Sequence, residues 1–197
     1  RQQARELIKG ALERGCSVKS LYIEVFQSCQ YEVGRLWQEN KITVAHEHYC
    51  TAATQLIMAE LYPYVVSSPR TGKHLIAAAV AGEVHEMGVR MVADFFEMDG
   101  WDTYFVGANT PIQSLVQLVI DRKPHMVALA ISTALNLGAA ASTIEQLRAL
   151  PERPLIMLGG QLINTSPGLW RELGADWTAL SAGEAVARGN ELVVARR

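Results

Sequence analysis

The stretch AGEVHEMG, residues 81–88, combines residue types that could bind a metal. Glu83, His85 and Gly88 follow the apolar run 75–80, so they stand just past the end of a predicted strand. A metal-binding imidazole usually donates its second N–H to a carboxylate, and Glu83 is near enough in sequence to accept it. A histidine at the start of a helix can also act only as a cap or a packing residue, so position alone leaves both roles open.

A single histidine does not make a metal site by itself. A zinc ion needs three or four protein ligands, so a metal bound by His85 would have to arrive almost fully coordinated inside a cofactor, such as a corrin or a haem. Glycines at strand ends suit a bulky ligand, because they allow close approach. Gly88 and the pair Gly159-Gly160 have such places, and the hydroxyls of Ser132 and Thr133 follow another predicted strand. Taken singly, these glycines also fit ordinary turns, and the hydroxyls ordinary strand-end caps.

The elements that must position these residues alternate after residue 73. Strands are expected at 74–80, 103–107, 126–132, 154–160 and near 176–180, with helices at 86–99, 111–122, 139–149, 167–173 and 183–194. This alternation predicts an α/β domain with a parallel sheet covered on both faces. Five strands favour the flavodoxin-like doubly wound order, in which ligands bind outside the carboxyl ends of the strands. Residues 81–88, 132–136 and 159–164 all fall at that edge.

Residues 1–68 predict an all-α architecture of three or four helices, a small bundle of the four-helix type. An apolar stripe over 3–13 indicates one helix, Ser17 is a candidate N-cap for a second, and Thr43 is a candidate N-cap for a third that runs to about Pro63. The stretch SSPRTGK is typical of a linker. We therefore expect a helical domain over 1–68 followed by a sheet domain over 73–197.

Composition limits the function. The 197 residues carry 18 Lys and Arg against 20 Asp and Glu, a formal net charge of −2, and no long basic run, so we expect no direct nucleic-acid binding. No apolar stretch approaches the roughly 20 residues of a membrane helix, so we expect no membrane partner. Three widely spaced cysteines without a CxxC pair predict buried free thiols, and no signal peptide is visible; both favour a cytoplasmic protein. Because the chain begins without Met, we expect an output domain outside these residues.

Together the motifs resemble the signature DxHxxG…SxL…GG of cobalamin-binding domains. EVHEMG at 83–88, STA at 132–134 and GG at 159–160 stand in that order. This family has a flavodoxin-like fold, often behind a helical bundle, and binds vitamin B12 base-off, with the motif histidine as the lower cobalt ligand. The resemblance implies that His85 binds cobalt and that the displaced nucleotide tail lies in a slot. The residues implied to border the cobalt or line that slot are Gly88, Ser132, Thr133, Gly159 and Gly160.

Two positions depart from the signature. Glu83 replaces the usual Asp, and Ala134 replaces the usual Leu. The longer carboxylate is expected to hold His85 differently. The remaining histidines, His74 and His125, stand at strand beginnings and are predicted to be structural. Trp101, Trp170 and Trp177 stand at helix–strand junctions and are predicted to be packing residues.

The helical half carries a second pattern, in LWQENKITVAHEHYC. Val44, Glu47 and His48 stand at i, i+3 and i+4 and so share a helix face, and Trp37 precedes Glu47 by ten positions. An indole is suited to cover an apolar, planar ligand. By residue type alone, Trp37 could instead be bundle core and Glu47-His48 a solvated pair.

The pattern Trp-x9-Glu-His resembles the adenosylcobalamin-dependent photoreceptors, the MerR-type light-responsive repressors of carotenoid synthesis and their relatives. The resemblance implies that Trp37 caps the upper axial group and that Val44, Glu47 and His48 contact the adenosyl moiety. It predicts a light sensor, not an enzyme, in which photolysis of base-off, His-on adenosylcobalamin changes domain packing or homo-oligomerisation. Those repressors commonly have a histidine after the tryptophan; Gln38 stands there, so we expect no bis-histidine product at that position.

Two other corrinoid functions stay open. A methyl-carrying corrinoid protein of a methyltransferase system shares the whole second half. It needs an open upper face, however, and Trp37 with Glu47-His48 argues against that. A coenzyme-B12 mutase subunit is the weaker alternative, because no substrate barrel accompanies the domain.

Overall fold

The structure is a computed structural model that describes residues 1–66 and 68–196. The chain divides into two compact units, Arg1–Ser67 and Ser68–Arg197. The prediction of a helical region followed by a parallel α/β domain is confirmed. Among the described residues, no helix is both long and apolar enough to cross a membrane.

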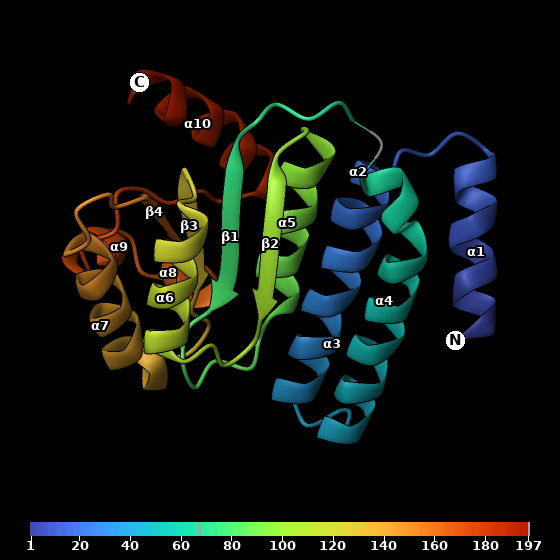
Figure 1. Ribbon diagram of the computed structural model, residues 1–197. Coiled ribbons are helices and arrows are strands. Elements are labelled where there is room, and N and C mark those ends of the chain that lie inside the picture. Colours follow the sequence, from blue (N-terminus) through green and yellow to red (C-terminus); the bar gives the residue numbers. More distant parts are fainter. Residues whose placement is uncertain (67, 197) are drawn as a thin grey trace. The chain divides into compact units, whose positions relative to one another are not determined.

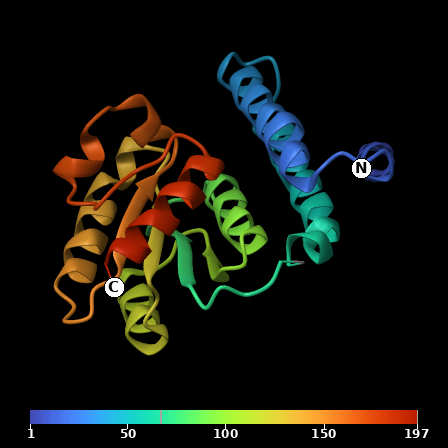
Figure 2. The same cartoon turned by 90° about the horizontal axis from the view of Figure 1, so that it is seen from above.

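Helices make up the first unit. They are α1 (Gln2–Glu13), α2 (Val18–Ser20), the π-helical η1 (Leu21–Gln27), α3 (Ser28–Gln38) and α4 (Val44–Val65). Because α2, η1 and α3 follow one another without a break, the described part of this unit forms three helical rods, within the three or four helices that we expected. α3 and α4 lie side by side (Figures 1 and 2).

Local sequence explains where these helices begin. The Ser17 hydroxyl accepts the Ser20 N–H at 3.0 Å, which satisfies one of the free N–H groups of the first turn, as the N-cap prediction requires. At Thr43 the backbone N–H donates to Nδ1 of His46 at 3.2 Å. α4 continues two residues past Pro63, further than predicted, because a proline in the last turn removes only one hydrogen bond.

The second unit is built on four parallel strands. They are β1 (His74–Ala79), β2 (Asp102–Gly107), β3 (Met126–Ala130) and β4 (Leu155–Gly159), in the order β2-β1-β3-β4. Figure 1 shows the arrows of β1 and β2 running in the same direction. The order reverses between β1 and β3, so the loops after these two strands flank the switch point at which doubly wound folds bind ligands.

The predicted fifth strand is not confirmed. Near 176–180 the chain forms an isolated parallel bridge from Trp177 to Met157, beside which the Asp176 N–H donates to the Ile156 carbonyl at 2.9 Å. Asp176 uses its carboxylate to accept the Ile156 N–H at 2.8 Å and to bind Arg153 at 2.9 Å. Ser181 then caps the next helix, so little chain remains to extend the pairing.

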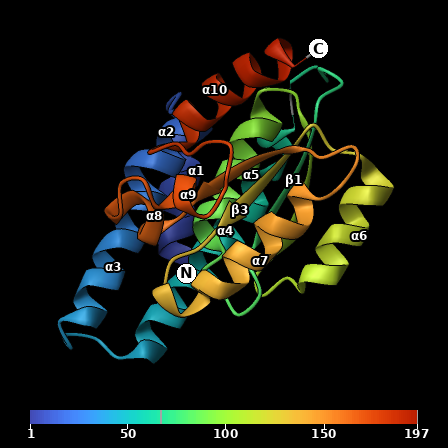
Figure 3. The same cartoon turned by 90° about the vertical axis from the view of Figure 1, so that its left-hand side faces the viewer.

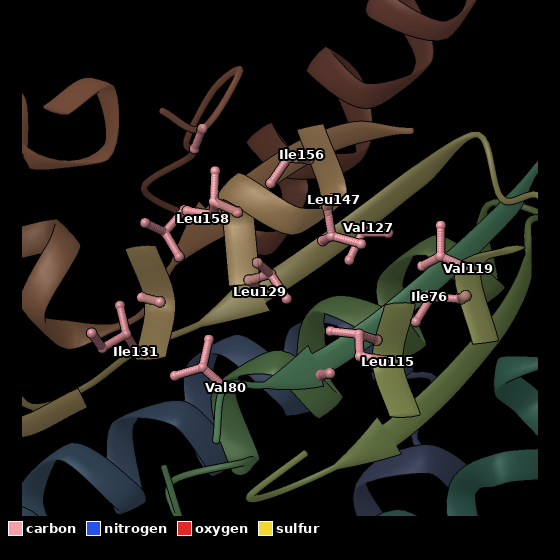
Figure 4. Packing of buried hydrophobic residues seen from close by; sticks show 14 of the residues in the cluster. Ile76, Val80, Leu115, Val119, Val127, Leu129, Ile131, Leu147, Ile156 and Leu158 are labelled. Carbon is pink, nitrogen blue, oxygen red and sulfur yellow. The ribbon is translucent and has the colours of Figure 1, made fainter. Parts of the chain in front are cut away.

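Helices cover both faces of the sheet, as predicted. They are α5 (Met87–Met98), α6 (Ile112–Arg122), the 3₁₀ turn η2 (Ala134–Asn136), α7 (Leu137–Arg148), α8 (Gln161–Thr165), α9 (Leu169–Glu172) and α10 (Ala182–Ala195). α5 and α10 lie on one side of the sheet, and α6 and α7 lie on the other (Figure 3). On the α6–α7 side, large aliphatic residues from β1, β3 and β4 form the main buried cluster, among them Ile76, Val127, Leu129, Ile156 and Leu158 (Figure 4).

Several residues predicted to be structural lie where expected. His74 is the first residue of β1, and its ring stacks on that of His125 with centroids 5.7 Å apart. Trp101 and Trp177 are buried. The cysteines are free, but the prediction that they are buried is wrong, since Cys16 and Cys29 are exposed.

Candidate functional site

Glu83 and His85 lie together in the loop between β1 and α5. Oε1 of Glu83 lies 2.5 Å from Nδ1 of His85 and also accepts the His85 backbone N–H at 3.0 Å. The side chain of Glu83 is only 1% exposed, whereas that of His85 is 57% exposed. The pair therefore joins a buried carboxylate to an imidazole whose other nitrogen, Nε2, is free to meet a ligand.

The second oxygen of Glu83 ties this loop to the one after β3. Oε2 accepts the backbone N–H groups of Ser132 at 2.7 Å and Thr133 at 3.3 Å, and the side-chain amide of Asn136 at 3.1 Å. The structure thus brings Glu83, His85, Ser132 and Thr133 together at the carboxyl edge of the sheet, where the sequence predicted them. Ser132 and Thr133 contribute backbone N–H groups to Glu83, not the hydroxyls we emphasised.

The hydrogen bonds determine the charge of Glu83. Burial alone would raise the pKa of this carboxyl, but the N–H groups of Ser132, His85 and Asn136 outweigh it and lower the pKa to about 2. Glu83 is therefore ionised at neutral pH and accepts a proton-bearing Nδ1. That tautomer leaves the lone pair on Nε2, which is the arrangement of a metal-ligating histidine held by a carboxylate.

Asn136 and Asn109 are parts of this site that we did not predict. Asn109 accepts the Gly82 N–H at 2.8 Å and donates its own N–H to the Glu83 carbonyl at 2.7 Å. Gly82 has φ +81°, and a Cβ there would lie 2.7 Å from Oδ1 of Asn136. A signal for Asn109 was its type, since Asn tolerates the left-handed backbone that it adopts with φ +49°; nothing local indicated Asn136.

The predicted glycines differ in what their missing side chain allows. A Cβ on Gly160, which has φ +106°, would lie 2.3 Å from the Ile131 carbonyl oxygen, so the fold itself requires this glycine. Gly88 and Gly159 have no atom within 4 Å of that position. They border open space, as a ligand at this edge would need.

On the α5–α10 face of the sheet, the side chains become smaller toward the same carboxyl edge. Three rows in register run across β1, β3 and β4: Leu75–Met126–Leu155, then Ala77–Ala128–Met157, then Ala79–Ala130–Gly159. Residues two apart along a strand share a face, so large side chains give way to small ones at the carboxyl end. The opposite face keeps Leu, Ile and Val to its end.

Exposed apolar side chains stand at this edge. Leu135, in the turn that follows β3, is 94% exposed, and Val84, between Glu83 and His85, is 68% exposed. No three His, Cys, Asp or Glu side chains in the described parts of the chain could jointly hold a metal ion. One available imidazole, open space beside glycines and exposed apolar groups fit a metal within a large planar cofactor.

The four candidate residues of the helical unit lie in the last turn of α3 and the first turns of α4. Trp37, near the end of α3, is 43% exposed, and Val44 is also exposed. His48 Nδ1 lies 2.6 Å from Oε2 of Glu47, so these two side chains form a carboxylate–imidazole pair. The His48 side chain is exposed to solvent, as the alternative interpretation of a solvated pair supposed, whereas that of Glu47 is half-buried.

Glu47 also has a role within the unit. Its Oε1 accepts the Thr51 hydroxyl at 2.7 Å, and Thr51 lies 3.0 Å from Oε1 of Gln30 on α3. Gln30 in turn donates to the Thr54 hydroxyl at 2.9 Å. Glu47 therefore belongs to a polar network that joins α3 to α4, which is a reason for a glutamate there that needs no adenosyl group.

Comparison with known proteins identifies related sequences over both units. A family model described as B12 binding domain matches residues 73–189, more than half of the chain, and a second model with the same description matches residues 1–62. Dimethylamine corrinoid protein 2 of Methanosarcina acetivorans is 26% identical over 172 residues, which span 84% of this chain and 77% of that protein.

Solved structures agree on the fold. The monomethylamine corrinoid protein of Methanosarcina barkeri has a TM-score of 0.84 at 20% identity, covering 95% of this chain and 90% of that one. The methanol:cobalamin methyltransferase complex MtaBC, also from Methanosarcina barkeri, has a TM-score of 0.59 at 17% identity, covering 96% of this chain and 72% of that one.

These comparisons contradict the prediction of a light sensor. The dimethylamine corrinoid protein matches 84% of the chain, whereas the HTH-type transcriptional repressor CarA of Myxococcus xanthus, at 28% identity, matches 120 residues, 60% of the chain and 41% of its own length. The light-sensing and transcriptional roles are therefore wrong. The pattern Trp-x9-Glu-His misled us because the Glu47 position also serves the contact between α3 and α4.

Proposed function

The chain belongs to the B12-binding domain family, and from this premise we propose that it is a methyl-carrying corrinoid protein of a methyltransferase system. The observation that carries the proposal is the His85–Glu83 pair, an imidazole with a free Nε2 in a unit that matches a B12 binding domain. The methylamine corrinoid proteins among its relatives support a methyl carrier in particular.

We propose His85 as the lower ligand of cobalt, with the corrinoid bound base-off. The displaced nucleotide tail needs room inside the protein. The row Ala79–Ala130–Gly159, with open space beside Gly159, supports a slot between the sheet and α5–α10. Ser132, Thr133 and Gly160 lie at the mouth of this slot, and Gly88 borders the cobalt ligand.

A bound corrinoid supplies a cobalt centre that accepts and releases a methyl group. The chain holds the lower imidazole in one tautomer, and the ionised Glu83 stabilises positive charge that the imidazole gains when it binds a metal. Val84 and Leu135 are the exposed apolar side chains that would offer the corrin ring a surface from which water is excluded.

Residues of the helical unit are proposed to contact the corrinoid as well. The match of residues 1–62 to a B12 binding domain supports this role for Trp37, Val44, Glu47 and His48. The exposed faces of Trp37 and Val44 are apolar and have surface to offer a ligand. In place of the adenosyl group that we expected, the upper group would be methyl.

The substrate and partner follow from the relatives. We propose a methylated amine as the source of the methyl group, and a methyltransferase as the partner that delivers it, because the relatives include methylamine corrinoid proteins and a methyltransferase complex. The chain would then be a component of an enzyme system and not an enzyme alone.

A binding and transfer experiment tests the function. The apo-protein is titrated with methylcobalamin and with adenosylcobalamin. Protein loaded with hydroxocobalamin is then reduced to the cob(I)alamin form and incubated with a methylamine methyltransferase and labelled dimethylamine. A carrier binds methylcobalamin at least as tightly as adenosylcobalamin, and it takes one labelled methyl group from dimethylamine while monomethylamine is released. Failure to take up either corrinoid, or uptake without any methyl transfer, contradicts the proposal.

A further inference from the structure

Trp177 has a buried polar atom that the protein leaves unpaired. Its side chain is 4% exposed, yet Nε1 has no hydrogen-bond partner within the described residues, and the hydroxyl of Thr178 is likewise buried and unpaired. Buried donors are almost always paired, because leaving one without an acceptor is costly. Trp101, the other fully buried indole, follows this rule and donates to Oδ1 of Asn190 at 3.1 Å.

The pairing of Trp177 determines the face on which it lies. Trp177 bridges Met157 in parallel, and Met157 is in register with Ala128 of β3. Ala128 shares its face with Met126, whose Cε would lie 3.0 Å from a Cβ on Gly189 of α10. Trp177 therefore lies on the α5–α10 face, opposite to Val127, Leu129 and Ile156 in Figure 4.

This is the face on which the side chains become smaller toward the carboxyl edge of the sheet. Trp177 aligns with the row Ala77–Ala128–Met157, one step before the smallest row, Ala79–Ala130–Gly159. An indole side chain is long enough to span a neighbouring strand, since strands lie about 4.8 Å apart. Trp177 is therefore one step along the strands from Ala130 and Gly159, the small residues that leave room for a ligand with hydrogen-bond acceptors.

We infer that Trp177 donates its indole N–H to the nucleotide tail of the corrinoid and thereby selects corrinoids that have a tail. The inference rests on the proposed function and extends it to a residue outside the sequence motifs. A tail carries phosphate, ribose and ring-nitrogen acceptors, whereas cobinamide, which lacks the nucleotide, offers none of them in the slot. The donor is already desolvated before binding, so an acceptor there gains the full hydrogen bond.

The test compares hydroxocobalamin with cobinamide as probes. Trp177→Phe keeps an aromatic ring and removes the N–H. We expect the Kd for hydroxocobalamin to rise about tenfold, as for the loss of one buried hydrogen bond, while the Kd for cobinamide stays within about twofold. Trp101→Phe is the matched control: it removes a paired buried indole, lowers the melting temperature and leaves the ratio of the two Kd values unchanged.

A measurement on the unmodified protein decides the case even if Trp177→Phe does not fold. Phe variants of Trp37, Trp101 and Trp170 assign three of the four indole N–H resonances, and the fourth belongs to Trp177. This resonance should move on addition of hydroxocobalamin and stay in place with cobinamide. Equal responses to both probes overturn the inference while the proposed function stands, and uptake of neither probe by the unmodified protein overturns the proposed function.

Discussion

Nδ1 of His85 lies 2.5 Å from Oε1 of Glu83, while the other oxygen of the same carboxylate receives three N–H groups from the loop after β3. The imidazole is thus positioned by two loops that are 49 residues apart in sequence. Since Glu83 is ionised and buried, rotating the imidazole would break a charge-assisted hydrogen bond to a carboxylate that cannot follow it.

Removing the His85 imidazole tests whether this side chain is the lower ligand of cobalt or only supports the fold. His85→Ala is expected to weaken cobalamin binding at least about tenfold, since even the loss of a group that only orients a metal ligand costs about 10- to 100-fold. It should also convert the absorbance spectrum to that of a corrinoid without a lower nitrogen ligand. His74→Ala is the matched control, because His74 also pairs with a carboxylate, Asp102 at 3.2 Å, but at the opposite edge of the sheet. An unchanged spectrum in His85→Ala would refute the assignment of the lower ligand.

The pKa of Glu83 makes a prediction about stability and pH. Its folded-state pKa of about 2 lies below the ordinary value of 4.5, so the carboxylate stabilises the fold above pH 4.5, and this contribution is lost as the pH falls toward 2. The shift corresponds to about 3 kcal/mol at pH 7. Glu83→Gln should therefore lower the free energy of unfolding by about that amount at pH 7, and by progressively less between pH 4.5 and 3.

Urea unfolding of both apo-proteins at several pH values measures this difference. A constant difference from pH 7 to pH 3 would mean that Glu83 is not held as a charged group.

Asn136 should act on the site through Glu83. Asn136→Ala removes one donor to the carboxylate, so we expect a loss of about 1.5 kcal/mol and a higher pKa of Glu83, which moves the acid loss of stability toward higher pH. Asn109→Ala removes an amide from the same region that contacts Gly82 and not the Glu83 carboxylate, so it should lower stability without moving that pH dependence. Equal pH profiles for the two variants would show that Asn136 has only a packing role.

Two adjacent glycines should respond differently to an added methyl group. Gly160→Ala places Cβ against the Ile131 carbonyl at a positive φ, so it should destabilise the apo-protein by at least about 3 kcal/mol. Gly159→Ala meets no atom within 4 Å and should change stability by less than about 1 kcal/mol, yet it fills the proposed slot and should weaken cobalamin binding at least tenfold. Thermal melting and corrinoid titration of both variants measure these effects, and tight binding by Gly159→Ala would remove this glycine from the slot.

Sequence reasoning predicted best what is local or periodic. Four strands, the helices between them and the Glu83–His85 pair follow from short-range patterns, and the carboxyl-edge rule then assembled the loops correctly. Asn136 was missed because its contact with Glu83 spans 53 residues and leaves no local sign. The fifth strand was overpredicted because the apolar pattern near 176–180 gave no sign that Asp176 would bond to the β4 backbone.

The function was mispredicted for a similar reason. The light sensor and the methyl carrier share the second half of the chain, so the choice between them depended on the short spacing of Trp, Glu and His in the first half. A glutamate at 47 also fits a network with Thr51 and Gln30 that joins two helices. Residue types on a helix face do not reveal which neighbours satisfy them. The structural role of Glu47 is visible only once the positions of α3 and α4 are known, because its network joins these two helices.

Trp37 tests whether the helical unit contributes to binding. Because more than half of this residue is buried, Trp37→Ala should lower the stability of that unit by about 1 to 2 kcal/mol, so the binding measurement is made where both variants are folded. Burying one indole face against a corrinoid is worth on the order of 2 kcal/mol, so the Kd of the full chain for methylcobalamin should rise roughly thirtyfold. Tyr31→Ala, an exposed aromatic on the same helix α3, is the control and should leave the Kd unchanged. Equal affinities for the two variants would remove Trp37 from the residues proposed to contact the corrinoid.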